Sequence, residues 1–273
     1  MPEVSVIVPF YKAEKTIEKC ARSLFEQTLD DIEFLFVDDC SPDGSLRVLE
    51  TVLEDYPSRK SQVRILKTDS NSGSALARVL GIKKAAGEYL IHCDADDEVE
   101  RTMYKTMSEK ARQEDSDFVW CDFFRDGPQS FSSSESASCA AQSCLSRGNQ
   151  ITVNQYFTQN NLSLIGNLLS GRFCGALWNK LIRRTIFNEN DFTYPRKSMN
   201  EDMLIVVQAL FYSKKPVHVA VPLYHYCVSS LSMTSTKTDV EGCLAKFNQS
   251  LENDLSILSF LEEKHLSSRF RTE

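Results

Sequence analysis

The sequence predicts an α/β fold in which a mainly parallel central sheet is flanked by helices. Apolar strand patterns alternate with amphipathic helix patterns over residues 1–100, and aspartates follow the ends of two of these strands. A hydrophobic content of 42% in 273 residues is enough to bury one large core. Alternation of this kind forms right-handed βαβ units, whose ligands bind beyond the carboxyl ends of the parallel strands. The sequence therefore places a candidate site at these aspartates.

Each element of the first half has its own local signal. Residues 4–8 form an apolar strand that ends at Pro9, and apolar side chains repeat at helical spacing over residues 14–25. The next strands are predicted as "EFLFVDD", "VRILKT" and "EYLIHC". The helices between them are "SPDGSLRVLETVLEDY" and "SGSALARVLGIKKAAG", and the second has Gly87 in the helix-stop position.

The second half is less regular. "MYKTMSEKARQE" predicts a helix, "DFVWCDFF" predicts a strand, and the serine-rich residues 126–150 predict a mobile loop. Helices are expected over residues 153–169, at "NKLIRRTIF" and at "EDMLIVVQALFYSKK". "PVHVAVPLYHYCV" predicts two extended pieces separated at Pro222, and an amphipathic helix is expected over residues 240–265.

Composition excludes several classes of protein. A net charge of −7 argues against nucleic-acid binding, because phosphate neutralisation needs a basic surface. The nine cysteines show no C-x-x-C spacing, which favours buried thiols over a zinc site. The opening "VSVIVPF" lacks the features of a signal peptide, and the longest apolar run, "LIVVQALF", is too short to span a bilayer. We therefore expect a cytoplasmic protein without a transmembrane segment.

The stretch "IHCDADDEVE", residues 91–100, crowds three aspartates into four positions after a strand. Two carboxylates about 4 Å apart repel by roughly 1 kcal/mol in water and by several-fold more at a protein surface, so a divalent cation is expected to offset the repulsion. The chain has neither G-x-G-x-x-G after its first strand nor the P-loop pattern G-x-x-x-x-G-K-[ST]. Any phosphates are therefore expected to be held by a metal ion.

Five blocks of sequence, taken together and in order, resemble a known family. They are "VSVIVPFYKAEKTIEKCARSLFEQT", "FLFVDDCSPDGS", "NSGSALARVLGIKKAAGEYLIHCDADD", "LWNKLIRRTIF" and "NEDMLIVVQAL". They resemble glycosyltransferase family 2, whose members are inverting enzymes with the Rossmann-like GT-A fold and use nucleotide-diphospho-sugars. The resemblance covers roughly residues 3–235. It implies a donor-binding half at 1–100, an acceptor-binding and catalytic half at 101–235, and a C-terminal helix at 236–273.

The resemblance assigns donor-binding roles in the first half. Pro9 and Tyr11 would lie at the nucleobase, where Tyr11 is either a stacking ring or an ordinary loop tyrosine. Asp39 would accept a hydrogen bond from the N3 proton of the base, which favours uridine or thymidine nucleotides. Asn71 and Arg78 belong to the block before the acidic cluster, where Arg78 would pair with an acid or with phosphate.

The family's D-x-D motif falls on Asp94, Ala95 and Asp96. Asp94 would meet the ribose or the donor sugar, and Asp96 would ligate Mn²⁺ or Mg²⁺. Asp97 would bind the ion through water. His225 either completes the shell of the cation or is a buried structural histidine.

The resemblance makes Asp202 the general base that deprotonates the acceptor hydroxyl, with Glu201 in support. Asp38 is expected to support Asp39, and Asp43 is expected to cap a helix.

Two residues depart from the family pattern. Cys227 stands where many members have an arginine, and Lys12 stands where asparagine is usual. Ser232 matches a family serine. Neither departure affects the D-x-D motif or the expected base.

These residues imply a metal-dependent transferase that moves a hexosyl or N-acetylhexosaminyl group from a UDP-sugar to a glycan, lipid-linked or other sugar-containing acceptor, in cell-surface polysaccharide synthesis. Peripheral association with the inner face of the membrane stays open. Two alternatives also remain: a nucleotide-sugar-binding module without turnover, and a sugar nucleotidyltransferase. A sugar nucleotidyltransferase would have a basic, glycine-rich phosphate loop near its N-terminus, and "PFYKAEKT" does not resemble such a loop.

Overall fold

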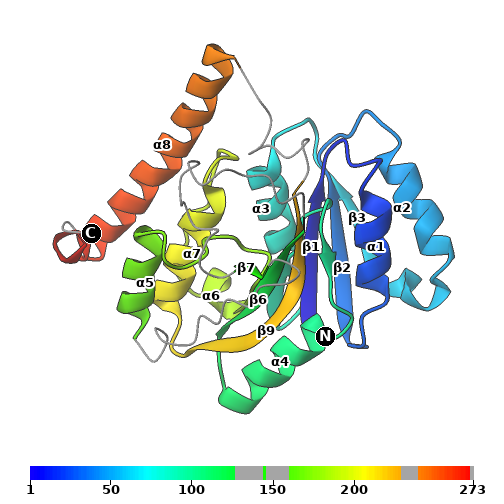
Figure 1. Ribbon diagram of the computed structural model, residues 1–273, viewed down its shortest axis with the longest axis horizontal. Coiled ribbons are helices and arrows are strands. Elements are labelled where there is room, and N and C mark those ends of the chain that lie inside the picture. The colour runs from blue at the N-terminus through cyan, green and yellow to red at the C-terminus, as the bar shows by residue number, and fades with distance from the viewer. Residues whose placement is uncertain (127–143, 146–159, 229–238, 271–273) are drawn as a thin grey trace.

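The computed structural model describes residues 1–126, 144–145, 160–228 and 239–270, and it has the expected α/β architecture (Figure 1). A central sheet runs through the molecule, and helices cover both of its faces. No helix within these residues is both long and apolar enough to cross a membrane.

The sheet contains nine strands in the described part of the chain and is mainly parallel, as predicted. Its order is β3-β2-β1-β4-β8-β6-β9-β5, with β7 paired to β6. Parallel pairs join β1 to β2 and β4, β2 to β3, and β6 to β7 and β9, whereas β8 is antiparallel to both of its neighbours and β5 is antiparallel to β9. The strands are β1 Val4–Phe10, β2 Ile32–Asp38, β3 Val63–Lys67, β4 Tyr89–His92, β5 Glu98–Val99, β6 Phe118–Asp126, β7 Cys144–Leu145, β8 Lys180–Arg183 and β9 Pro216–Cys227.

The helices follow the predicted alternation in the first half. A short 3₁₀ helix, η1, precedes β3, and another, η2, follows the last α-helix. The helices are α1 Ile17–Phe25, α2 Ser45–Glu54, η1 Pro57–Gln62, α3 Ser74–Lys84, α4 Met103–Glu114, α5 Asn161–Leu169, α6 Thr185–Asn188, α7 Glu201–Tyr212, α8 Val240–Glu263 and η2 Ser267–Arg269.

The core has one layer on each face of the sheet. Val6 of β1 packs in the layer that includes α1, α2 and α4, while its neighbour Ile7 packs in the layer that includes α3, α5 and α7. Every residue of β1 and β2 is buried, as expected for parallel strands covered on both faces. This double burial fixes the strand ends that carry the candidate site.

The segment "NKLIRRTIF" was predicted as a helix, and this prediction is wrong for its first half. Residues Lys180–Arg183 form β8, between β4 and β6, and only Thr185–Asn188 is helical. Leu181 and Ile182 are buried in opposite core layers, which a strand achieves with adjacent residues and a helix does not. The apolar run is too short for periodicity to separate the two structures.

The break predicted at Pro222 is a register irregularity inside one strand. β9 is continuous, and its pairing with β6 shifts on both sides of Asp122, which lies opposite Pro222. Proline has no backbone N–H to donate, so it is tolerated where the ladder is already irregular. The short strand β5 was not predicted. Of the expected loop at 126–150 only residues 126 and 144–145 are described, and the helix expected at 153–169 is described from residue 160 onward.

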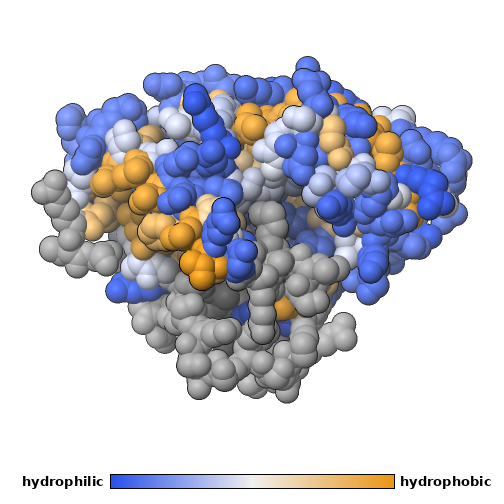
Figure 2. Space-filling view, turned by 90° about the horizontal axis from the view of Figure 1, so that it is seen from above, coloured by the Kyte–Doolittle hydropathy of each residue, from blue (hydrophilic) through white to orange (hydrophobic). Residues whose placement is uncertain are grey.

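The C-terminal helix is confirmed as α8, which packs against α7 and projects beyond the rest of the molecule at the top of Figure 1. Its buried side chains are few, and apolar residues cover its outward face. In Figure 2 this helix crosses the left of the view, where orange residues are prominent. The exposed residues are Val240, Leu244, Phe247, Leu251, Leu255 and Leu258.

Gly87 was predicted to stop the third helix, but α3 ends at Lys84 and Gly87 has no left-handed backbone. The glycine is required by a close approach to β1. A Cβ at position 87 would lie 2.6 Å from Ser5 Oγ, 2.7 Å from Ser5 N and 2.9 Å from Val4 C.

We expect Gly87→Ala to lower the free energy of unfolding by about 1–3 kcal/mol, because backbone atoms cannot yield as a side chain does. Urea denaturation measures the change. Gly44→Ala is the matched control, since its Cβ would meet only the flexible carboxylate end of Glu14 and the nearby Arg47 guanidinium. An equal decrease in the free energy of unfolding of both variants would show that the close approach to β1 does not explain the requirement for glycine at position 87.

Candidate active site

The candidate site lies where β1, β2 and β4 end side by side. The chain leaves β1 at Phe10 and β2 at Asp38, and two non-glycine residues just beyond these ends have left-handed backbones, Lys12 with φ 53° and Cys40 with φ 57°. Asparagine adopts this conformation more readily than lysine. Such conformations cluster at ligand sites.

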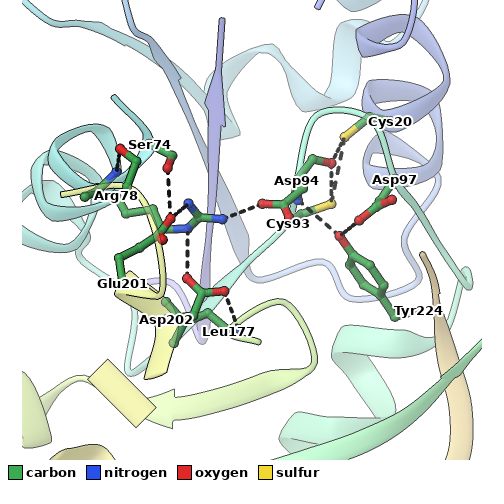
Figure 3. Close-up of polar contacts among 12 residues, drawn as sticks. Cys20, Ser74, Arg78, Cys93, Asp94, Asp97, Leu177, Glu201, Asp202 and Tyr224 are labelled. Atoms are coloured by element: carbon green, nitrogen blue, oxygen red, sulfur yellow. Dashed lines mark hydrogen bonds and ion pairs between the residues drawn. The ribbon is translucent and has the colours of Figure 1, made fainter. Parts of the chain in front are cut away.

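Arg78 is the centre of the site, and Figure 3 shows its guanidinium between Asp94 and the acids of α7. Its Nη2 donates to Asp94 Oδ1 at 2.6 Å and its Nη1 donates to Glu201 Oε1 at 2.9 Å. Its Nε lies 3.6 Å from Asp202 Oδ1. The Arg78 side chain is only 6% exposed, so one buried cation joins α3, the loop after β4 and the start of α7.

Negative charge exceeds positive charge in this cluster. Burial alone would lower the pKa of Arg78, but the charges of Asp202, Asp94 and Glu201 raise it. Burial raises the pKa of Glu201 to about 7, and the charge of Asp202 adds to this effect. Burial also raises the pKa of Asp94 to about 6 against the opposing charge of Arg78. The site is therefore short of positive charge.

The two acids of α7 have different partners. Glu201 Oε1 accepts hydrogen bonds from Arg78 and from Ser74 Oγ at 2.8 Å. Asp202 Oδ2 accepts from the Leu177 amide at 3.1 Å, whereas its Oδ1 has no hydrogen-bond partner among the described residues. Asp202 is therefore oriented through Oδ2, while its buried Oδ1 faces Arg78 Nε without a hydrogen bond.

The acidic loop after β4, residues 94–97, is held in place by hydrogen bonds with β9. Tyr224 Oη donates to Asp97 Oδ2 at 2.6 Å and accepts from the Asp94 amide at 3.1 Å. The Cys227 amide donates to Asp97 Oδ1 at 2.7 Å. The ring of Tyr224 stacks on Trp178 with centroids 4.3 Å apart. Asp97 is therefore a buried structural acid of the loop, and burial raises its pKa well above the usual value.

Asp96 is the carboxylate of this loop that fits a metal ion best. It is partly exposed, its pKa is raised by burial, and the groups that oppose this shift are its own backbone amide and the charge of Arg78. No cluster of three His, Cys, Asp or Glu side chains suited to a metal ion occurs in the described ranges. Mg²⁺ is commonly held by one or two carboxylates together with substrate phosphates, and carboxylates also suit Mn²⁺. Asp96 beside Asp94 supplies such a donor set.

His225 lies opposite Glu98 in the pairing of β5 with β9. Its Nε2 is 2.8 Å from Glu100 Oε1, and its ring stacks on Phe124 with centroids 4.7 Å apart. Metal binding through Nε2 would require this contact to open, so the role expected for His225 stays a prediction.

Asp39 is 3% exposed and organises the loop before α3. Its Oδ1 accepts from Thr68 Oγ1 at 2.8 Å and from the Ser72 amide at 2.9 Å, and its Oδ2 accepts from the Gly73 amide at 2.7 Å. A carboxylate has about four acceptor positions, so one remains on Oδ2. Gly73 has φ 86°, which allows this turn.

The remaining expected residues lie around this loop. Pro9 is buried in β1, Tyr11 is 40% exposed just beyond it, and Asn71 is exposed. Asp38 accepts from the Ser41 amide at 2.7 Å. Ala95 is buried within the acidic loop, Asp43 binds Ser45 at the start of α2, and Ser232 falls outside the described residues.

The family model described as "Glycosyl transferase family 2" matches residues 5–189 of the chain. The chain belongs to glycosyltransferase family 2. Among curated relatives, the uncharacterized glycosyltransferase EpsJ of Bacillus subtilis is 32% identical over 195 residues, which are 71% of this chain. The chain spans about half the length of EpsJ, 52%.

Solved structures of glycosyltransferases have the same fold. S. aureus TarS in complex with UDP-GlcNAc aligns with a TM-score of 0.68 at 19% identity, over 96% of this chain and 72% of that chain. The mannosyltransferase PcManGT of Pyrobaculum calidifontis, in complex with GDP-Man and Mn²⁺, aligns with a TM-score of 0.59 at 13% identity. The alignment covers 96% of this chain and 75% of that chain. The GT-A fold expected for the family is confirmed.

Two residues of the site were missed by sequence reasoning. Tyr224 has no local signal beyond its place in an aromatic run, because its partners lie 127 and 130 residues away. His92, at the end of β4, is buried, and neither of its ring nitrogens has a hydrogen-bond partner within the described chain. Burial and the charge of Arg78 hold the pKa of His92 well below its usual value, so a neutral ring lies near the guanidinium.

We expect the metal-free protein to lose stability as pH rises from about 4.5 to about 7. The raised pKa values of Glu201 and Asp94 mean that the folded state binds more protons than the unfolded state over this interval. The contribution of these two groups to the free energy of unfolding is fully present below the pKa values that they have in the unfolded chain. It is lost as pH rises through about 6 to 7, the pKa values in the folded state. Between pH 5 and pH 7.5, the melting temperature of Glu201→Gln should therefore fall by a few degrees less than that of the unmodified protein.

Thermal melting in chelator at constant ionic strength measures the effect. Glu50→Gln, which neutralises an exposed glutamate on α2, is the control and should behave as the unmodified protein. The same pH slope in Glu201→Gln and in the unmodified protein would contradict the assignment.

Proposed function

We propose that the chain is a metal-dependent, inverting glycosyltransferase that moves a sugar from a UDP-sugar to a hydroxyl of a sugar-containing acceptor. One observation carries the proposal: Arg78 gathers Asp94 of the D-x-D segment and the acids Glu201 and Asp202 into one cluster at the strand ends. A donor-binding loop and a base candidate thus lie on either side of one cation.

The uridine preference rests on Asp39 and Tyr11. The fold alone leaves the nucleotide open, because TarS was crystallised with UDP-GlcNAc and PcManGT with GDP-Man. The remaining acceptor position of Asp39 suits the N3 proton of uracil, which cytosine lacks. The half-exposed ring of Tyr11 would stack on the base, a contact worth about 1–3 kcal/mol in comparable systems.

Asp96 and Asp94 would hold the cation together with the donor diphosphate, and His225 would join them if its contact with Glu100 opens. Bound Mn²⁺ or Mg²⁺ would neutralise the negative charge of the diphosphate, which leaves with the nucleotide. The protein's own part is to hold these carboxylates in place through Tyr224 and Arg78.

Asp202 is the better base of the two acids on α7. Its Oδ2 is fixed by the Leu177 amide, and its Oδ1 accepts no hydrogen bond within the described chain but lies 3.6 Å from Arg78 Nε. Glu201 Oε1, by contrast, accepts hydrogen bonds from both Arg78 and Ser74. Asp202 would take the proton of the acceptor hydroxyl as that oxygen attacks the anomeric carbon from the side opposite the leaving group. In-line attack of this kind inverts the anomeric configuration.

We further propose a hexosyl or N-acetylhexosaminyl donor and a glycan or lipid-linked acceptor of cell-surface polysaccharide synthesis, used on the cytoplasmic side. The donor is tested by calorimetry of UDP, CDP and GDP with Mn²⁺, followed by UDP-sugars against an array of glycan acceptors. Tighter binding of UDP together with transfer to an acceptor supports the proposal. Equal competition by CDP would remove the role given to Asp39, and formation of a nucleotide-sugar from a sugar 1-phosphate would replace the proposal with a nucleotidyltransferase.

Asp202→Asn should lower kcat by about 10²- to 10⁴-fold, because asparagine keeps the shape of the side chain but cannot accept the proton. UDP affinity should be unchanged. Transfer to acceptor and hydrolysis by water should fall together, and the product of the unmodified enzyme should have inverted configuration. Near-normal transfer by the variant would move the base to Glu201, and a retained configuration would end the proposed mechanism.

Asp96→Ala should lower transfer by about 10²-fold or more and should make UDP binding insensitive to Mn²⁺. Calorimetry with Mn²⁺ and with chelator measures both effects in the variant and in the unmodified protein. Asp30→Ala removes an exposed acid before β2 and serves as the control. If chelator leaves UDP affinity of the unmodified protein unchanged, the metal assignment fails.

A further inference from the structure

The segment before α7 has an unusual kind of anchoring. Residues 190–200 connect α6 to α7, and within the described chain they form no backbone-to-backbone hydrogen bond outside the regular elements. Side-chain amides hold them instead. Gln208 of α7 both donates to and accepts from the backbone of Thr193, at 2.8 Å in each case.

Asn253 of α8 holds the other end of this segment. The residue is 2% exposed, and its Nδ2 donates to the Lys197 carbonyl at 2.9 Å and to the Met199 carbonyl at 2.7 Å. Both protons of the amide are therefore used, one on each side of Ser198. An amide nitrogen with two donor protons is needed for this geometry, and aspartate could not provide it.

The anchored residues lead directly into the acid pair. Asn200 is the N-cap residue of α7, has φ 62° and donates through its side chain to Asp254 of α8. Glu201 and Asp202 follow it. A non-glycine residue in the left-handed region is held there by its surroundings, so the contacts with α8 set the direction in which α7 begins.

The same segment also touches the donor loop, residues 68–73 between β3 and α3. Ser198 Oγ accepts from the Ala75 amide at 3.4 Å, and it lies 2.3 Å from the position that a Cβ on Gly73 would take. Gly73 is in turn held by Asp39. The donor loop thus has its own anchor, whereas the residues just before α7 are held by α8.

We propose that Asn253 is a positioning residue for the transfer reaction: it fixes residues 197–200 and so sets Glu201 and Asp202 against Arg78. This inference rests on the proposed function. α8 lies beyond residue 189, where the match to the family model ends, so the link adds a contribution from a helix outside the matched segment.

The test compares Asn253→Ala with Asn248→Ala, the same change at an exposed position of the same helix. kcat is determined at saturating donor and acceptor and is expressed per UDP-binding site counted by calorimetry, so that unfolded protein lowers the site count and not kcat. We expect Asn253→Ala to lower kcat per site by about 10- to 100-fold, as small misplacements of catalytic groups do. UDP affinity should stay the same, because Asp39 holds the donor loop.

A second variant, Asp254→Ala, provides an independent test if Asn253→Ala does not fold. Asp254→Ala removes the exposed partner of Asn200 and should lower kcat per site in the same direction by a smaller factor, again without a change in UDP affinity. Values for the Asn253 and Asp254 variants equal to that of Asn248→Ala would overturn the proposal.

Hydrogen–deuterium exchange separates this proposal from the proposed function. Amides of residues 197–204 should exchange faster in Asn253→Ala than in Asn248→Ala, whatever the substrate. If the unmodified protein transfers sugar from no UDP-sugar, the proposed function fails and the exchange result still decides the anchoring. Unchanged exchange at 197–204 would overturn the anchoring itself.

Discussion

The site depends on one buried guanidinium that faces three carboxylates. Arg78 lies 16 residues before Asp94 and 123 residues before Glu201, so its ion pairs join parts of the chain that β-strand pairing alone does not bring into register. Removing one partner from a buried ionic cluster leaves the others uncompensated, at a cost of about 3–5 kcal/mol. For this reason Arg78 cannot be exchanged for a neutral residue without losing the connection between the loop after β4 and α7. Lysine would lack the planar fork that reaches Asp94 and Glu201 at once.

The excess of carboxylates around the Arg78 guanidinium favours a ligand-binding role for this cluster over a purely structural one. A chain selected for stability alone would not gather Asp94, Glu201 and Asp202 around one buried arginine, since the charge of Asp202 raises the cost of ionising both Asp94 and Glu201. The deficit of positive charge is what a divalent cation would relieve. Sites that bind charge in this way trade stability of the empty protein for affinity toward the ligand.

The sequence predicts the first half well because its signals are local. Apolar strands such as "VSVIVPF" and helices of clear periodicity need no distant partner to be recognised, and the acids at the ends of β2 and β4 follow from the rule for parallel sheets. β8 could not be predicted, because a four-residue segment with two apolar residues, "KLIR", fits a strand and a helix equally well until its neighbours β4 and β6 are known. The supports of the site, Tyr224 under the acidic loop and Asn253 behind α7, depend on contacts between distant residues that no local pattern records. Gly87 shows a third limit, since the sequence suggested a helix stop, whereas the structure requires the glycine for a close approach to β1 that no local pattern records.

The two sides of the site are held by different means, and this difference bears on specificity. On the other side of Arg78, Asp39 directly follows the fully buried strand β2 and accepts hydrogen bonds from the backbone amides of Ser72 and Gly73. On the side of α7, the described residues before the acid pair are held by side-chain hydrogen bonds, chiefly from Gln208, Asn253 and Asp254. Strand ends buried on both faces tolerate little change, whereas a connection anchored by a few side chains can be altered by single substitutions. The structure therefore combines a rigid frame at the end of β2 with a more adjustable one before α7, and Arg78 links the two through its ion pairs with Asp94 and Glu201.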